Sequence, residues 1–145
     1  MLKHLVSIDD LSATEIQKLF HRTASLKNPH SEYHSRILES SSYLKNKILT
    51  NLFYEPSTRT SSSFHAAMLK LGGRVISINE ITYSSVSKGE NLQDTIRTMG
   101  CYSDIIVLRS QNSGDAKLAA EVSEVPIIKV LSRILTILFW ESSVR

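Results

Sequence analysis

Apolar residues in this chain follow two alternating patterns, short continuous runs and positions spaced by three or four. Four runs have the length and composition of buried strands: 48–54, 74–78, 104–109 and 125–128. Four other segments repeat apolar residues with the period of one helix face: 11–27, about 58–71, the segment carrying Leu92, Ile96 and Met99, and 115–122. Strands that alternate with helices of this length are typical of βαβ units.

The alternation predicts an α/β fold with a parallel sheet of about four strands and helices on both faces. Its crossovers should be right-handed. The segment 11–27 precedes the first strand and is predicted to be an extra N-terminal helix. Ser12 and Glu15 have capping-box spacing at its start, and Asn28-Pro29 ends the pattern. The polar, serine-rich segment 30–45 could hold one further short helix.

A hydroxyl-rich turn at 56–63 joins the first strand to the helix that follows it. One interpretation is an ordinary helix start, in which Ser57 caps the helix and the other hydroxyls face solvent. The alternative is an anion site, because the N–H groups and the dipole at a helix start attract negative charge. Arg59 favours the alternative, since a cation in the first helical turn opposes the dipole unless an anion lies beside it.

Two further polar features are predicted at the same edge of the sheet. Ligands of parallel α/β sheets bind outside the carboxyl ends of the strands, where the pattern places Arg109 and the polar loop 79–90. Taken singly, Arg109 would mark a strand's exit into solvent, and Lys88 in the loop would be solvated surface. Their convergence with the turn predicts a site for a small phosphate-bearing anion.

Composition and the remaining polar residues narrow the function classes. A formal net charge of +3 without a dense Lys/Arg run gives little support to nucleic-acid binding. No apolar run approaches the ~20 residues that span a bilayer, and the first residues lack a signal-peptide pattern. Cys101 is the only cysteine, which favours a reducing cytoplasm. The five histidines lie outside metal-ligand spacings, and no P-loop, GxGxxG or Ser-His-Asp order is present.

Several motifs resemble the aspartate/ornithine carbamoyltransferase family. Residues 53–60 (FYEPSTRT) are similar to a motif specific to that family. The segment 84–95 (SSVSKGENLQDT) resembles the aspartate branch, because ornithine carbamoyltransferases usually lack its Lys-Gly-Glu. The segments 5–12 (LVSIDDLS) and 104–109 (DIIVLR) also match. The resemblance runs from about residue 3 to residue 128.

The resemblance implies a binding site for carbamoyl phosphate. The residues implied to bind it are Ser57, Thr58, Arg59, Thr60, Arg109, Ser84 and Lys88. The first four would hold the phosphate, and Arg59, Thr60 and Arg109 would be catalytic, the last two by polarising the carbamoyl carbonyl. Ser84 and Lys88 would reach a neighbouring subunit's site, which makes the family's catalytic unit a homotrimer.

The reaction implied by the resemblance belongs to pyrimidine biosynthesis. The amine of L-aspartate attacks the carbamoyl carbon, giving N-carbamoyl-L-aspartate and phosphate, with no metal and no organic cofactor. Negative charge builds on the carbonyl oxygen and on the leaving phosphate. Fixed hydrogen-bond donors and cations therefore suit this chemistry.

The chain departs from the family pattern after residue 128. The expected division is a carbamoyl phosphate-binding domain at 1–128 and a divergent tail at 129–145, whose apolar stripe suits a helix. The family's His-Pro-Thr-Gln motif and its aspartate-binding second domain are expected to be absent. A frameshift or early stop would explain the tail. Alternatively, the tail caps a surface that the family's C-terminal helix covers.

Three hypotheses about function follow. The first is the carbamoyl phosphate domain of an aspartate carbamoyltransferase, with little or no turnover alone. The second is a non-catalytic assembly module that keeps the fold and the trimer-forming surface. The third is part of an ornithine carbamoyltransferase, which the Lys88-Gly89-Glu90 segment disfavours.

Overall fold

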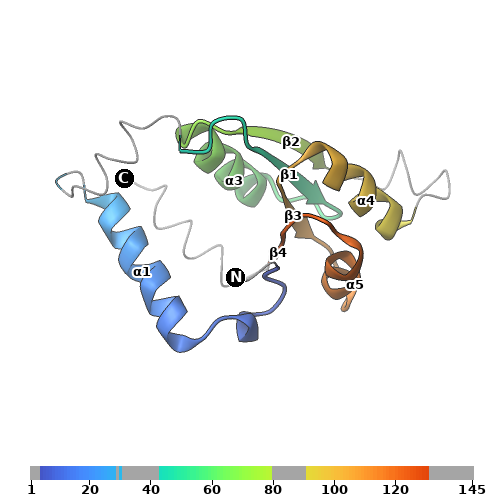
Figure 1. The fold of residues 1–145 in the computed structure, drawn as a ribbon, viewed down its shortest axis with the longest axis horizontal. Coiled ribbons are helices and arrows are strands. Elements are labelled where there is room, and N and C mark those ends of the chain that lie inside the picture. Colours follow the sequence, from blue (N-terminus) through green and yellow to red (C-terminus); the bar gives the residue numbers. More distant parts are fainter. Residues whose placement is uncertain (1–3, 29, 31–42, 80–90, 131–145) are drawn as a thin grey trace.

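The computed structural model describes residues 4–28, 30, 43–79 and 91–130 (Figure 1). In chain order, its elements are η1 (Ile8–Asp10), α1 (Ala13–Lys27), β1 (Ile48–Phe53), α3 (Thr58–Lys70), β2 (Arg74–Asn79), α4 (Leu92–Tyr102), β3 (Ile105–Arg109), α5 (Asp115–Val122) and β4 (Ile127–Lys129). The predicted alternation of strands and helices is therefore confirmed. The predicted short helix within 30–45, the loop 79–90 beyond Asn79, and the tail beyond Val130 lie outside the described residues.

The four strands form one parallel sheet in the order β2-β1-β3-β4. β1 and β3 occupy the centre, and Phe53 at the end of β1 pairs with Arg109 at the end of β3. Helix α3 covers one face of the sheet, and α4 and α5 cover the other (Figure 1). This arrangement confirms the predicted α/β fold with helices on both faces.

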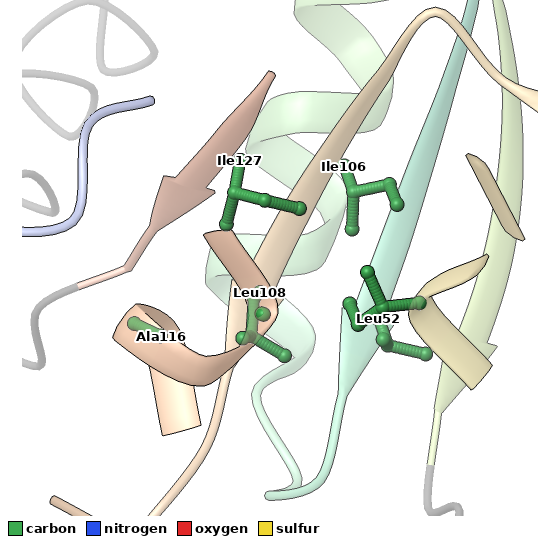
Figure 2. Packing of buried hydrophobic residues seen from close by; sticks show 7 residues of the cluster. Leu52, Ile106, Leu108, Ala116 and Ile127 are labelled. Carbon is green, nitrogen blue, oxygen red and sulfur yellow. The ribbon is translucent and has the colours of Figure 1, made fainter. Parts of the chain in front are cut away.

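The core has two apolar layers because alternate residues of a strand point to opposite faces. One layer joins the sheet to α4 and α5, and Figure 2 labels five of its residues: Leu52, Ile106, Leu108, Ala116 and Ile127. The other layer joins Leu49 and Phe53 of β1 to Phe64 and Met68 of α3. Both layers pack against β1, so the turn that follows β1 is anchored to a strand that is buried on both faces.

An ion pair joins β1 and β3 at their amino ends. Lys47 Nζ donates to Asp104 Oδ1 at 2.6 Å, and the backbone N–H of Ile48 donates to Asp104 Oδ2 at 2.8 Å. The hydrogen bond from Lys47, then that from Ile48, hold the pKa of the Asp104 carboxyl below its ordinary value. The register of the two central strands is thereby fixed at the end opposite the predicted site.

The fourth strand begins two residues later than predicted. Pro126 has no N–H group to donate, and it contributes only its carbonyl, which accepts from Ile106 N at 2.9 Å. The N-terminal segment then extends the sheet, because Leu5 forms a parallel bridge with Ile128. Because the bridge involves only one residue of the N-terminal segment, it leaves no repeating apolar pattern in the sequence, and the contact was not predicted.

Helix α1 has the predicted capping box at Ser12 and Glu15. It lies apart from both faces of the sheet in Figure 1, and two residues of its apolar face, Leu19 and Phe20, are 41% and 52% exposed. None of the helices in the described ranges combines the length and apolarity needed to cross a membrane.

Candidate functional site

The turn between β1 and α3 leaves the start of α3 without a side-chain cap. Ser57 occupies the N-cap position with φ −155° and ψ 73°, but its hydroxyl makes no capping hydrogen bond to the helix. The hydroxyl instead accepts a hydrogen bond from Arg109 Nη1 at 3.1 Å. The first turn of α3 also contains no acidic residue. The ordinary-cap interpretation of Ser57 is therefore wrong, and the positive end of this helix dipole is not neutralised by a carboxylate of its own first turn.

Arg109 is the second component of the site. The register of β1 and β3 places it opposite Phe53, beside the start of the turn, and Tyr54 N donates to its carbonyl at 2.9 Å. Its Nε and Nη2 donate to Glu55 Oε2 at 3.3 and 3.1 Å, while Nη1 reaches Ser57. The Arg109 side chain is only 17% exposed. The guanidinium therefore turns back over the turn and does not extend into solvent.

The other three predicted residues of the turn differ in their exposure to solvent. Thr58 and Arg59 are exposed in the first turn of α3, whereas Thr60 is 6% exposed. The Thr60 carbonyl accepts from Ser63 Oγ at 2.8 Å. Thr58 and Arg59 can meet a ligand directly from solvent, whereas Thr60, in the same turn of the helix, is largely shielded from solvent.

The structure thus brings five predicted residues to one edge of the sheet: Ser57, Thr58, Arg59, Thr60 and Arg109. The other two predicted residues, Ser84 and Lys88, lie outside the described residues. The start of α3 and the Arg109 guanidinium meet at Ser57, and each can donate hydrogen bonds to an anion with several oxygens. Arg59 adds a second guanidinium in the first turn of the helix. A phosphate group or a polarised carbonyl fits this arrangement.

Two residues of the site were given no role by the sequence analysis. Glu55 pairs with Arg109, and its 24% exposed side chain places a carboxylate beside the turn. Asn51 lies in β1, fully buried, and its Nδ2 donates to Ser61 O of α3 at 3.1 Å. An amide within an apolar strand was the available signal for Asn51. The signal for Glu55 was an acid between a buried strand and Pro56.

Within the part of the chain that the structure describes, no group of three or more His, Cys, Asp or Glu side chains could hold a metal ion. The Ser57–Thr60 turn and Arg109 supply backbone hydrogen-bond donors and two guanidinium groups, with the Glu55 carboxylate beside them. Groups of this kind can bind and polarise an anionic, oxygen-rich ligand.

Residues 3–136 match the family model of the aspartate/ornithine carbamoyltransferase carbamoyl-P binding domain. Among curated relatives, the aspartate carbamoyltransferase catalytic subunit of Clostridium perfringens (strain SM101 / Type A) is 43% identical over 126 residues. The alignment covers 87% of this chain and 39% of the relative. The same subunit of Methanocaldococcus jannaschii is 45% identical over 128 residues, covering 88% and 40%.

Solved structures give the same result. The catalytic subunit of M. jannaschii aspartate transcarbamoylase aligns with a TM-score of 0.78 and 42% identity, covering 94% of this chain and 44% of that one. Aspartate transcarbamoylase from Trypanosoma cruzi in complex with carbamoyl phosphate aligns with a TM-score of 0.73 and 35% identity, covering 88% and 38%. The chain spans about two fifths of the length of the curated relatives it matches.

Proposed function

The chain belongs to the aspartate/ornithine carbamoyltransferase family, and we propose that it binds carbamoyl phosphate at the Ser57–Thr60 turn and Arg109. One observation carries the proposal: the Arg109 guanidinium meets the uncapped start of α3 through the Ser57 hydroxyl, at 3.1 Å. A helix start and a guanidinium that share a contact can donate to the same ligand.

We assign the two halves of carbamoyl phosphate to different parts of the site. The backbone N–H groups at the start of α3, together with the Arg59 guanidinium, bind the phosphate oxygens. Arg109 and Thr60 polarise the carbamoyl carbonyl. Arg109 suits this role because the partly buried guanidinium is fixed by its contacts with Glu55 and Ser57, so little reorganisation is needed when charge develops on the carbonyl.

Glu55 gives the proposed site a competing partner for Arg109. The carboxylate accepts two hydrogen bonds from that guanidinium, at 3.3 and 3.1 Å. A ligand oxygen that binds Arg109 must share or replace these bonds. We infer that Glu55 weakens the binding of anions that lack a group able to compete for Arg109.

We propose that the complete reaction is transfer of the carbamoyl group to L-aspartate, as part of pyrimidine biosynthesis in the cytoplasm. The relatives that support this acceptor are named aspartate carbamoyltransferase catalytic subunits, and they extend well beyond the region they share with this chain. The Lys88-Gly89-Glu90 segment supports the aspartate branch over the ornithine branch. The chain alone is expected to bind carbamoyl phosphate with little or no turnover.

We also propose a homotrimer in which Ser84 and Lys88 reach the site of a neighbouring copy. The support is the resemblance of residues 84–95 to the aspartate branch of the family. Sedimentation velocity of the purified chain, with and without carbamoyl phosphate, tests this proposal. A monomer at all concentrations would contradict it, and a stable assembly without any ligand response would favour a non-catalytic assembly module.

Isothermal titration calorimetry with carbamoyl phosphate and with inorganic phosphate tests the binding site. Arg59→Ala and Arg109→Ala should each weaken binding by more than tenfold, because each removes a charge-assisted hydrogen bond worth about 1.5–3 kcal/mol. Arg97→Ala is the matched control, since Arg97 is an exposed arginine of α4 paired with Asp94. Absence of binding to the unmodified chain, or equal binding by Arg59→Ala, would overturn the proposal.

A further inference from the structure

Asn51 places a carboxamide in the apolar layer between β1 and α3. It lies in the central strand, with Ser77 and Val107 as its register partners on the two sides. Leu49 and Phe53 share its face of β1, because alternate residues of a strand point the same way. Those two residues belong to the apolar layer under α3. The Asn51 side chain is fully buried at this position.

The Asn51 amide connects the sheet to the first turns of α3. Its Nδ2 donates to Ser61 O at 3.1 Å and lies 3.4 Å from Ser61 Oγ. Ser61 N in turn donates to Ser57 O at 3.0 Å, which is the bond that closes the first turn of the helix. A side chain of β1 is therefore joined through Ser61 to Ser57, the residue that contacts Arg109.

Stability alone is a poor explanation for this amide. Its Oδ1 is buried and has no hydrogen-bond partner among the described residues. An unsatisfied buried acceptor costs free energy, because it loses its hydrogen bonds to water and gains none in the protein. Inside a helix, the Ser61 carbonyl already has an intrahelical N–H available to it, so the bond from Asn51 is not needed to satisfy that group.

We propose that Asn51 is a positioning residue for the anion site, resting on the function proposed above. The bond from β1 to Ser61 fixes where the first turn of α3 stands relative to the ends of β1 and β3. The N–H groups of that turn and Arg109 must converge on one ligand. A small shift of the helix along the apolar layer would separate them, since apolar contacts are not directional.

The test compares phosphate affinity with thermal stability in Asn51→Leu. Inorganic phosphate and carbamoyl phosphate are titrated by calorimetry, and the melting temperature is measured in parallel. Affinity for both should fall on the order of tenfold, the lower end of the loss found when hydrogen bonds that support metal-binding side chains are removed. The melting temperature should stay the same or rise, because the unsatisfied Oδ1 is removed. If Asn51 only stabilised the fold, Asn51→Leu would lower the melting temperature and leave the affinity for both anions unchanged.

Two control variants separate this role from general disturbance of the core. Thr50 is also fully buried in β1, and its Oγ1 has no hydrogen-bond partner among the described residues, but it faces away from α3. Thr50→Val should leave anion affinity unchanged. Ser61→Ala keeps the carbonyl that accepts the 3.1 Å bond and loses only the longer hydroxyl contact, so it should weaken anion binding much less than Asn51→Leu.

The outcomes distinguish this proposal from the one it rests on. If the unmodified chain binds phosphate, Arg59→Ala loses binding and Asn51→Leu keeps it, the positioning role is overturned while the proposed function stands. If the unmodified chain binds neither anion, both are overturned. Asn51→Ala, with a smaller side chain, is tested alongside. Failure of both Asn51 variants to fold would replace the positioning role with a structural one.

Discussion

Helices α1 and α3 both begin after a serine, but the two helix starts are in opposite states. At α1, the Ser12 hydroxyl accepts from Glu15 N at 3.3 Å, and the Glu15 carboxylate accepts from Ser12 N at 2.8 Å. At α3, the Ser57 hydroxyl makes no capping bond and accepts from Arg109. The same residue type in the same position thus closes one helix and leaves the other open.

The difference lies in the residue three positions later and in what the fold places nearby. Glu15 supplies the carboxylate that satisfies the start of α1, whereas Thr60 has no charge to offer α3. Arg109 then draws the Ser57 hydroxyl toward the end of β3. A closed start contributes to stability, and an open start beside two arginines can bind an anion. Four experiments test this contrast.

The largest effect is expected from Arg59→Glu, which gives α3 the acidic first turn that α1 has. Phosphate affinity should fall by about a hundredfold, because a charge-assisted hydrogen bond is replaced by repulsion. Helix stability should rise by about 0.3–1 kcal/mol at low salt, since a carboxylate favours a helix start. Calorimetric titration and thermal melting measure the two effects. Arg97→Glu on exposed α4 is the control, and equal losses of binding would contradict the site.

Glu55→Gln is expected to have the next largest effect, with the opposite sign. The variant removes the carboxylate that accepts two bonds from Arg109 and keeps a side chain of the same shape. Carbamoyl phosphate should bind up to about fivefold more tightly, corresponding to about 1 kcal/mol for a partly exposed ion pair. Titration with carbamoyl phosphate at two salt concentrations measures the change. Unchanged or weaker binding would show that Glu55 does not compete for Arg109.

Alanine at the two serines should separate stability from binding. Ser12→Ala should destabilise α1 by about 1 kcal/mol, because it removes a capping hydroxyl, and should leave phosphate binding unchanged. Ser57→Ala should change stability by less and weaken phosphate binding, because no capping bond is lost but Arg109 loses a partner. Amide hydrogen exchange in α1 and α3, with phosphate titration, measures both. Equal losses of protection at the two helices would contradict the contrast.

The smallest effect is expected when the pH is lowered and the Glu15 carboxylate at the start of α1 becomes protonated. The Ser12 hydroxyl, then the Ser12 backbone N–H, hold the pKa of the Glu15 carboxyl below its ordinary value of 4.5. The stabilisation from this carboxylate is therefore present above about pH 4.5 and is lost as the pH falls through the lowered pKa. Amide exchange in the first turn of α1 should quicken there beyond the intrinsic pH dependence of exchange. Glu15→Gln should remove that excess change.

Most of the fold could be predicted because its signals are local and periodic. Apolar runs gave the strands, and spacings of three and four gave the helices. The start of β4 was missed because Pro126 interrupts the ladder without interrupting the apolar run. The pairing of Leu5 with Ile128 was missed because it joins residues far apart in the sequence.

The candidate site was predictable in its composition and less so in its internal contacts. The positions of Ser57 and Arg109 followed from the rule that parallel strands end at one edge. The bonds from Arg109 to Glu55 and Ser57 depend on the register that sets Phe53 against Arg109, and no sequence pattern encodes that register. The contact from Asn51 to Ser61 likewise depends on how α3 packs over β1.

The bridge between Leu5 and Ile128 also sets an order of events during synthesis. Leu5 N donates to Ile127 O at 2.8 Å, and Lys129 N donates to Leu5 O at 2.8 Å. Neither bond can form until the ribosome has released the chain beyond β4, although Leu5 is made long before that strand. The central strands can pair earlier, because β3 precedes β4 in the chain. The segment that carries Leu5 is therefore made well before it can dock, and closing so long a loop makes this contact entropically costly.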